Sequence, residues 1–130
     1  MIINIGTDII DIRRIKKTIN KYGDKFKNRC FHKSEILKSE NRLKTAESYS
    51  KRYAAKEACA KALGTGLARG VFWKDIEVIN NKFGKPIIIL NNKAVKILNQ
   101  ISNKNTRIEV SLSDEKNYAI SNVIIFNEKK

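Results

Sequence analysis

The stretch that decides the fold is residues 52–63, RYAAKEACAKAL, in which five of the twelve residues are alanine. Alanine has the highest helix propensity, and Thr45 upstream provides a start signal. We therefore predict a long central helix over about residues 45–63 that ends at Gly64. Its small side chains allow another backbone, or a ligand, to approach the helix closely.

The sequence on both sides of this helix predicts an α+β domain. Residues 2–10 are rich in isoleucine, which is typical of a buried strand, and Asp11 is placed to cap an amphipathic helix behind it. The remaining segments predict a short helix at 34–39, a hairpin formed by strands 76–79 and 87–90, a helix near 94–101, and two strands at 108–112 and 118–126. This order favours an antiparallel sheet with helices packed on one face. We expect one domain over residues 1–130.

Composition excludes several classes of protein. The chain of 130 residues is 42% hydrophobic with one proline, so it is not expected to be disordered. Apolar runs are too short for a membrane span and no signal peptide is visible, so we expect a cytoplasmic protein without membrane association. Two cysteines and a single histidine exclude a zinc finger or zinc ribbon, and we expect both thiols to be reduced.

The charge predicts an anionic partner. The formal net charge is +14, of which +10 lies in residues 11–61. Nucleic acid, a membrane surface, a polyphosphate ligand and an acidic protein all fit such a charge. A compositional bias towards lysine, of the kind an AT-rich genome produces, is the alternative explanation. The aromatic residues do not interleave with the basic runs and no recognition motif is visible, which disfavours nucleic acid.

Three residues of the chain could form a reactive site. Glu57 and Lys61 are four residues apart and share a helix face, although an ordinary surface ion pair has the same spacing. Asp8 lies in an apolar strand, where a carboxylate needs a partner unless it lies at the strand end as a cap. If Asp8 and Glu57 converge, their oxygens suit Mg²⁺, which completes its coordination with water and substrate phosphate.

The glycine-containing loop that follows the helix has two possible roles. Because Gly64, Thr65 and Gly66 follow a helix rather than precede one, they form neither a Walker loop nor a dinucleotide fingerprint. A helix C-cap is one interpretation. A phosphate contact made by the loop together with Lys61 is the other.

Several motifs, taken in order and spacing, carry a resemblance to a known family. They are Ile5-Gly6-Thr7-Asp8-Ile9, Phe31 with Ser34-Glu35, residues 52–58, residues 61–66, Asp75-Ile76-Glu77, Gly84-Lys85-Pro86, and Ser111-Leu112-Ser113 with Tyr118-Ala119. In this combination the chain resembles the small bacterial holo-[acyl-carrier-protein] synthases, which are 4′-phosphopantetheinyl transferases. The resemblance spans nearly the whole chain.

The resemblance implies a fold, a reaction and an assembly. Family members transfer the 4′-phosphopantetheine group of coenzyme A to a serine hydroxyl of an apo acyl carrier protein, a step that serves fatty acid biosynthesis. They depend on Mg²⁺ and release adenosine 3′,5′-bisphosphate. The small bacterial type is a homotrimer with active sites between subunits. A nucleic-acid-binding module and a non-catalytic scaffold that binds carrier protein are the alternative functions.

Residue roles follow from the matching positions. The resemblance makes Asp8 and Glu57 the Mg²⁺ ligands, with Lys61 as a further catalytic residue. It assigns coenzyme A contacts to Lys61, Arg52, Gly64, Thr65 and Gly66, and docking of the acidic carrier protein to Arg13, Arg14, Lys17 and Lys21, with Arg14 as first choice. One position departs from the family, because Asp114 stands where histidine is usual. We expect Glu57 to be the general base, with Asp114 as the second candidate, directed towards Lys116 or the turn.

Overall fold

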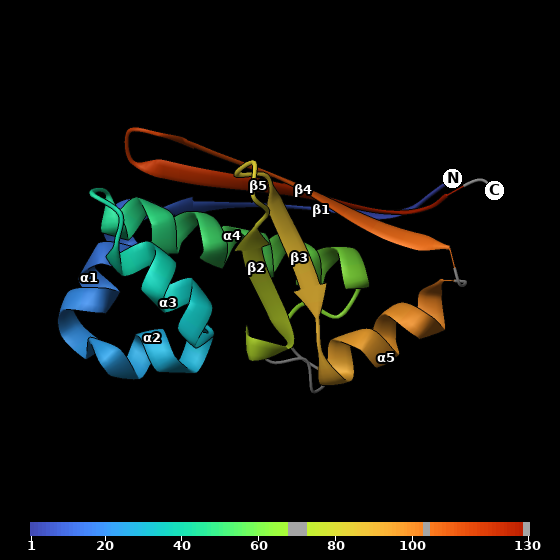
Figure 1. The fold of residues 1–130 in the computed structure, drawn as a ribbon, viewed down its shortest axis with the longest axis horizontal. Coiled ribbons are helices and arrows are strands. Elements are labelled where there is room, and N and C mark those ends of the chain that lie inside the picture. The colour runs from blue at the N-terminus through green and yellow to red at the C-terminus, as the bar shows by residue number, and fades with distance from the viewer. Residues whose placement is uncertain (68–72, 103–104, 129–130) are drawn as a thin grey trace.

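Helix α4 (Thr45–Leu63) runs through the middle of the molecule, between a three-stranded sheet and a separate hairpin (Figure 1). The computed structural model describes residues 1–67, 73–102 and 105–128. Its other elements are β1 (Ile2–Asp11), α1 (Ile12–Tyr22), α2 (Asp24–Cys30), α3 (Lys33–Glu40), the short 3₁₀-helix η1 (Trp73–Asp75), β2 (Ile76–Asn80), β3 (Pro86–Leu90), α5 (Asn92–Ile101), β4 (Thr106–Glu115) and β5 (Tyr118–Asn127). The predicted α+β class and the long central helix are confirmed.

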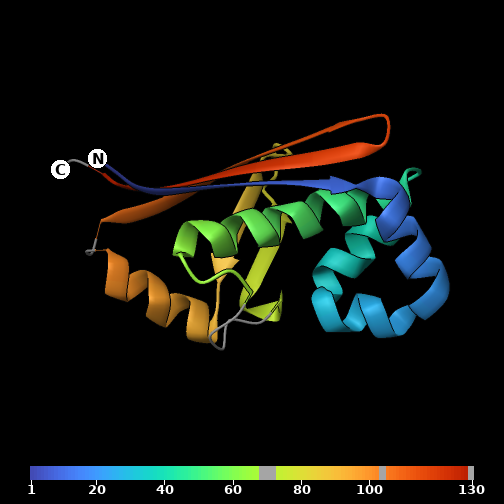
Figure 2. The same cartoon turned by 180° about the vertical axis from the view of Figure 1, so that it is seen from behind.

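The larger sheet has the strand order β1-β5-β4, and both pairings are antiparallel. Strand β1 pairs with β5 although nearly the whole chain lies between them, so that Asp8 lies opposite Ser121. Helix α4 covers one face of this sheet, and α1, α2 and α3 gather beside the first half of α4 (Figure 2). The expected sheet with helices on one face is therefore present.

Two features differ from the expectation. Strands β2 and β3 form the predicted hairpin, but it is a sheet of its own on the other side of α4. Helix α2 was not predicted, because its seven residues, DKFKNRC, are too few and too polar to show a helical repeat. It still matters for packing, since Cys30 at its end is buried.

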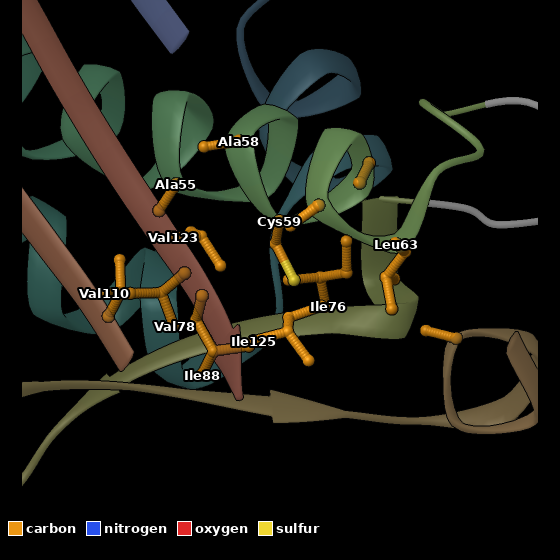
Figure 3. Packing of buried hydrophobic residues seen from close by; sticks show 13 residues of the cluster. Ala55, Ala58, Cys59, Leu63, Ile76, Val78, Ile88, Val110, Val123 and Ile125 are labelled. Atoms are coloured by element: carbon orange, nitrogen blue, oxygen red, sulfur yellow. The ribbon is translucent and has the colours of Figure 1, made fainter. Parts of the chain in front are cut away.

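The main core lies between the second half of α4, the three-stranded sheet and the hairpin. Alanines 55, 58, 60 and 62 and Cys59 are fully buried, and Val123 and Ile125 of β5 pack against this half of the helix (Figure 3). Ile76, Val78 and Ile88 of the β2–β3 hairpin belong to the same cluster. Because apolar residues contact the helix from two directions, α4 is buried around most of its circumference rather than along one stripe.

Gly6 of β1 allows α4 to lie directly on the sheet. A Cβ atom at Gly6 would lie 2.0 Å from the carbonyl oxygen of Ala58 and 2.8 Å from the backbone nitrogen of Ala62. Both neighbours are backbone atoms of a buried helix, so neither moves without displacing α4. A side chain of any size at this position is therefore incompatible with the observed packing.

We predict that Gly6→Ala destabilises the fold by at least about 3 kcal/mol, since overpacking against a backbone cannot be relieved by a rotamer change. Urea denaturation monitored by circular dichroism measures the loss. Ser111→Ala, on an exposed position of β4, serves as the control and should change stability by less than about 0.5 kcal/mol. Equal stabilities of the two variants would contradict the proposed close contact.

Candidate active site

Asp8 lies on the face of β1 that points towards α4. Its register partner Ser121 is fully buried, and the Asp8 side chain is only 14% exposed. Lys61 lies above it on α4 and its Nζ donates hydrogen bonds to Asp8 Oδ1 at 3.2 Å and to the carbonyl oxygen of Thr7 at 3.0 Å. The strand carboxylate therefore has the charged partner that its apolar surroundings require.

Glu57 belongs to the same group of charges. Its carboxyl is half-buried, and this burial, followed by the negative charge of Asp8, raises its pKa above the ordinary value. Lys61 and Arg14 oppose the rise with their positive charges. Two carboxylates and two cations from β1, α1 and α4 thus meet at one place, and three of these residues were predicted as a site.

The donor set suits a magnesium ion bound with a phosphate substrate. Two carboxylates that repel each other gain from a shared divalent cation, and Mg²⁺ usually takes one or two carboxylates together with water and phosphate oxygens. Within the described residues no group of three or more His, Cys, Asp or Glu side chains could hold a metal by itself. The remaining ligands would have to come from solvent and substrate, as expected for Mg²⁺.

The hydrogen bonds of the loop after α4 are those of a helix C-cap. The backbone N–H of Gly64 donates to Lys61, and those of Thr65 and Gly66 donate to Ala60. The Thr65 hydroxyl donates to the carbonyl of Gly66 at 2.7 Å. These N–H groups complete the helix end and are not directed at a ligand, so the predicted phosphate contact of this loop has no support in its hydrogen bonds.

Arg52, which the sequence analysis grouped with Lys61, lies on the other side of α4. Their separation of nine positions corresponds to about 180° of helical rotation. The Arg52 guanidinium donates to Asn80 of β2 at 3.0 Å and to Ser48 at 3.2 Å, while its buried Nε has no partner. The chain therefore presents two basic sites on opposite faces of one helix rather than a single site.

Arg52 lines an open pocket of about 770 Å³ between α4, the loop before it and the β2–β3 hairpin. Its basic lining residues are Arg42, Lys44, Lys51 and Arg52, and its acidic ones are Glu47 and Asp114. No sequence motif marks Arg42, Lys44 or Lys51, because single basic residues ahead of a helix or within its first half carry no distinguishing pattern. Their positive excess suits an anionic ligand.

Asp114 contacts a residue of this pocket instead of Lys116. Its carboxylate forms an ion pair with Lys51 of α4 at 3.3 Å. Asp114 also lies in register with Ala119 on β5, whereas Asp8 pairs with Ser121 on the opposite side of that strand. The expected orientation towards Lys116 is therefore not observed, and Asp114 is not among the charges that act on Glu57.

The four docking candidates on α1 are all exposed, but they differ in their partners. Arg13 forms a bidentate pair with Asp11, with distances of 2.9 and 2.8 Å, and Lys21 lies over the ring of Tyr22. Arg14 acts on Glu57 and Tyr53 electrostatically. Arg14 thus connects the basic surface of α1 with the carboxylates of the candidate site.

The outer face of the three-stranded sheet is apolar and open. Ile5, Ile9 and Ile124 are 65%, 61% and 38% exposed, and a hydrogen bond of 2.7 Å between Thr7 and Asn122 lies among them. Exposed isoleucines clustered on one sheet face are unusual for a monomer and typical of an interaction surface. The sequence analysis treated β1 as fully buried, since its near-continuous apolarity does not separate a core face from an interface.

Comparison with known proteins shows which family this chain is similar to. The profile of the 4′-phosphopantetheinyl transferase superfamily matches residues 4–123. Holo-[acyl-carrier-protein] synthases of Rhizobium meliloti (strain 1021) and Parvibaculum lavamentivorans are 64% and 61% identical over 80 and 84 residues. These segments cover 62% and 65% of this chain, and the chain spans only 58% and 63% of the two relatives.

Solved structures agree over a longer range. The holo-[acyl-carrier-protein] synthase of Neisseria meningitidis has a TM-score of 0.85 at 34% identity, covering 98% of this chain and 100% of that one. The Helicobacter pylori enzyme in complex with coenzyme A has a TM-score of 0.80 at 28% identity, covering 94% of this chain and 99% of that one.

Among the described helices, none has the length and apolarity needed to cross a bilayer.

We predict that Glu57→Gln raises the melting temperature at pH 7 by about 1–3 °C, a small gain because the group is half exposed. The raised pKa means that folding disfavours the Glu57 carboxylate, and glutamine removes that penalty. The gain should disappear as pH falls below the ordinary glutamate value of about 4.5, where Glu57 is protonated in both states. Differential scanning calorimetry at pH 4 and pH 7 tests this, with the exposed Glu115→Gln as control.

Proposed function

Because the chain belongs to the 4′-phosphopantetheinyl transferase superfamily, we propose that it transfers the 4′-phosphopantetheine group from coenzyme A to a serine hydroxyl of an apo acyl carrier protein, with adenosine 3′,5′-bisphosphate as the second product. The observation that carries the proposal is the convergence of Asp8, Glu57 and Lys61 between β1 and α4. The Helicobacter pylori relative bound to coenzyme A supports the substrate.

Asp8 and Glu57 are the proposed Mg²⁺ ligands. Bound there, the ion would neutralise charge on the pyrophosphate of coenzyme A and make the departing phosphate a better leaving group. Lys61 is the proposed phosphate contact, because its ammonium lies beside the same carboxylate at 3.2 Å. Its positive charge would stabilise the negative charge that develops during transfer.

Glu57 is the proposed general base that accepts the serine proton. Its carboxylate can accept the proton directly or through a Mg²⁺-bound water, which the ion would acidify. Asp114 is disfavoured for this role because its carboxylate is paired with Lys51.

The pocket beside Arg52 is the proposed site for the nucleotide end of coenzyme A. It carries four basic side chains and a buried guanidinium Nε without a partner. Arg52 and Lys61 project from opposite sides of α4, so one coenzyme A cannot reach both on the same copy of the chain. If both bind the same molecule, the active site must be shared between two copies.

A homotrimer with shared sites satisfies this requirement. The exposed isoleucines of the sheet offer an apolar surface for contact between copies, and a head-to-tail contact repeated around a three-fold axis closes a ring. The Thr7–Asn122 pair within this face would favour one register of association, since a polar group at an apolar interface penalises misaligned contacts.

The exposed basic face of α1 is the proposed docking surface for the acidic carrier protein. Arg14 connects this face to the site, because its positive charge acts on Glu57. Lys17 is also exposed on this helix, whereas Arg13 and Lys21 already have the contacts described above. Docking here would bring the acceptor serine towards Glu57.

We predict that two variants, each impaired at limiting coenzyme A, restore activity when they are mixed and assayed under that condition. Glu57→Gln should lower kcat at least about 100-fold, the usual scale for loss of a general base, and Arg52→Met should lower turnover at limiting coenzyme A. Unfolded and refolded together in equal amounts, they should recover about a quarter of wild-type activity, because a quarter of shared sites receive both native residues in random trimers.

The transfer assay uses coenzyme A, Mg²⁺ and apo carrier protein, with each variant refolded alone as the control. Failure to recover activity would place Arg52 and Glu57 in the same copy. Wild-type protein that transfers nothing would refute the proposed function itself. Where Arg52→Met does not fold, the double substitution Arg42→Ala/Lys44→Ala in the same pocket replaces it.

We predict that Arg14→Glu raises the KM for carrier protein about tenfold and leaves the KM for coenzyme A within about twofold, because it reverses one charge of a docking surface. The effect should weaken at 0.5 M salt, where exposed charges are screened over a few ångströms. Lys96→Glu, on the exposed face of α5, is the charge-matched control. Equal changes in both KM values would remove Arg14 from docking.

A further inference from the structure

The buried ion pair between Glu35 of α3 and Lys56 of α4 has no part in the chemistry described above. Both side chains are 0% exposed, and Lys56 Nζ lies 2.7 Å from Glu35 Oε1. Resting on the proposed function, we propose that this pair is a positioning device that fixes the rotation of α4 about its axis, and thereby directs Glu57 and Lys61 towards Asp8.

The polar atoms of the pair also form hydrogen bonds to the residue before α3, to β2 and to η1. Glu35 Oε1 also accepts from the backbone N–H of His32 at 2.9 Å, and Oε2 accepts from that of Val78 on β2 at 3.1 Å. Lys56 Nζ donates in addition to the carbonyl of Trp73 in η1 at 3.1 Å and lies 5.2 Å from the centre of the Phe31 ring. The lysine is therefore fixed in direction as well as in distance.

Helix α4 needs such a directional contact. Its buried positions include the consecutive runs 54–56 and 58–60, so no apolar stripe defines which side faces the sheet. Alanine surfaces are smooth and resist rotation weakly, since they lack the large side chains that interlock between neighbours. The Gly6 contact fixes how close α4 lies to β1 but involves only backbone atoms of the helix.

Lys56 lies where it can fix the rotation of α4 about its axis. It lies about 200° of helical rotation from Ala58, which contacts Gly6, so the helix is held from opposite sides. Glu57 lies between the two, about 100° from each. A rotation of about 10° would move a side-chain end on a helix of this radius by about 1 Å. Displacements of that size at a reacting group can lower turnover about 100-fold.

The energetics of buried ion pairs also argue against a role of the Glu35–Lys56 pair in stability alone. A buried ion pair can often be replaced by neutral side chains of similar shape without loss of stability, whereas removal of one partner leaves an unpaired charge and is strongly destabilising. Stability and positioning can therefore be separated by comparing single variants with the neutral double variant.

The experiment compares Glu35→Gln, Lys56→Met and the double variant Glu35→Gln/Lys56→Met with wild-type protein. The single variants should melt well below wild type. The double variant should regain most of the melting temperature, yet its kcat should remain at least about tenfold low and its half-saturating Mg²⁺ concentration should rise. The KM for carrier protein should stay within about twofold, because α1 does not contact the pair. Ile88→Ala, a core truncation on β3, controls for lost stability and should retain kcat at 20 °C.

A double variant that is folded and turns over at the wild-type rate overturns the proposal, since a purely structural pair behaves in this way. If the double variant does not fold, Glu35→Asp takes its place: it keeps the charge but shortens the reach to Lys56. Wild-type kcat and Mg²⁺ dependence in folded Glu35→Asp would likewise overturn the proposal. Absence of transfer by the wild-type protein is a different result, because it refutes the proposed function.

Discussion

The contact between Gly6 of β1 and the backbone of α4 at Ala58 and Ala62 is the constraint on which the rest of the structure depends. It places a helix directly on a strand, without the layer of side chains that usually separates the two. Because of this closeness, a carboxylate on the strand and side chains on the helix reach the same small space. The candidate site between Asp8, Glu57 and Lys61 is a direct consequence.

The same closeness explains the composition of α4. A strand against one side and a hairpin against the other leave room only for small residues, which accounts for the alanines that made this helix recognisable in the sequence. The helix therefore has two functional faces, one directed to β1 and one directed to the pocket beside Arg52. In the proposed assembly of copies, each face would serve a different active site.

Much of this arrangement could be predicted from local patterns. The boundaries of α4, the cap at Asp11 and the grouping of Glu57 with Lys61 follow from propensity and periodicity, and the structure agrees with each. The opposite placement of Arg52 also lies in the spacing, since nine residues are two and a half helical turns. On one copy of the chain the two residues therefore lie on different faces of the helix.

Other features depend on contacts that no local pattern carries. Glu35 and Lys56 are 21 positions apart, and nothing in that spacing indicates a buried ion pair. Asp114 of β4 likewise pairs with Lys51 of α4. The loop at Gly64 illustrates a third limit, because a glycine turn suits a helix cap and an anion site equally well. Only the direction of its N–H groups distinguishes the two.

The pairing of β1 with β5 has a consequence for how the chain folds. Ile5 lies opposite Ile124, so the sheet under α4 cannot form until the last strand is available. Contacts of such long sequence separation slow folding, because the intervening chain must lose entropy before they form. During synthesis, the smooth and apolar sides of α4 would remain uncovered until the ribosome has released β5. In this interval the exposed apolar surface is open to aggregation.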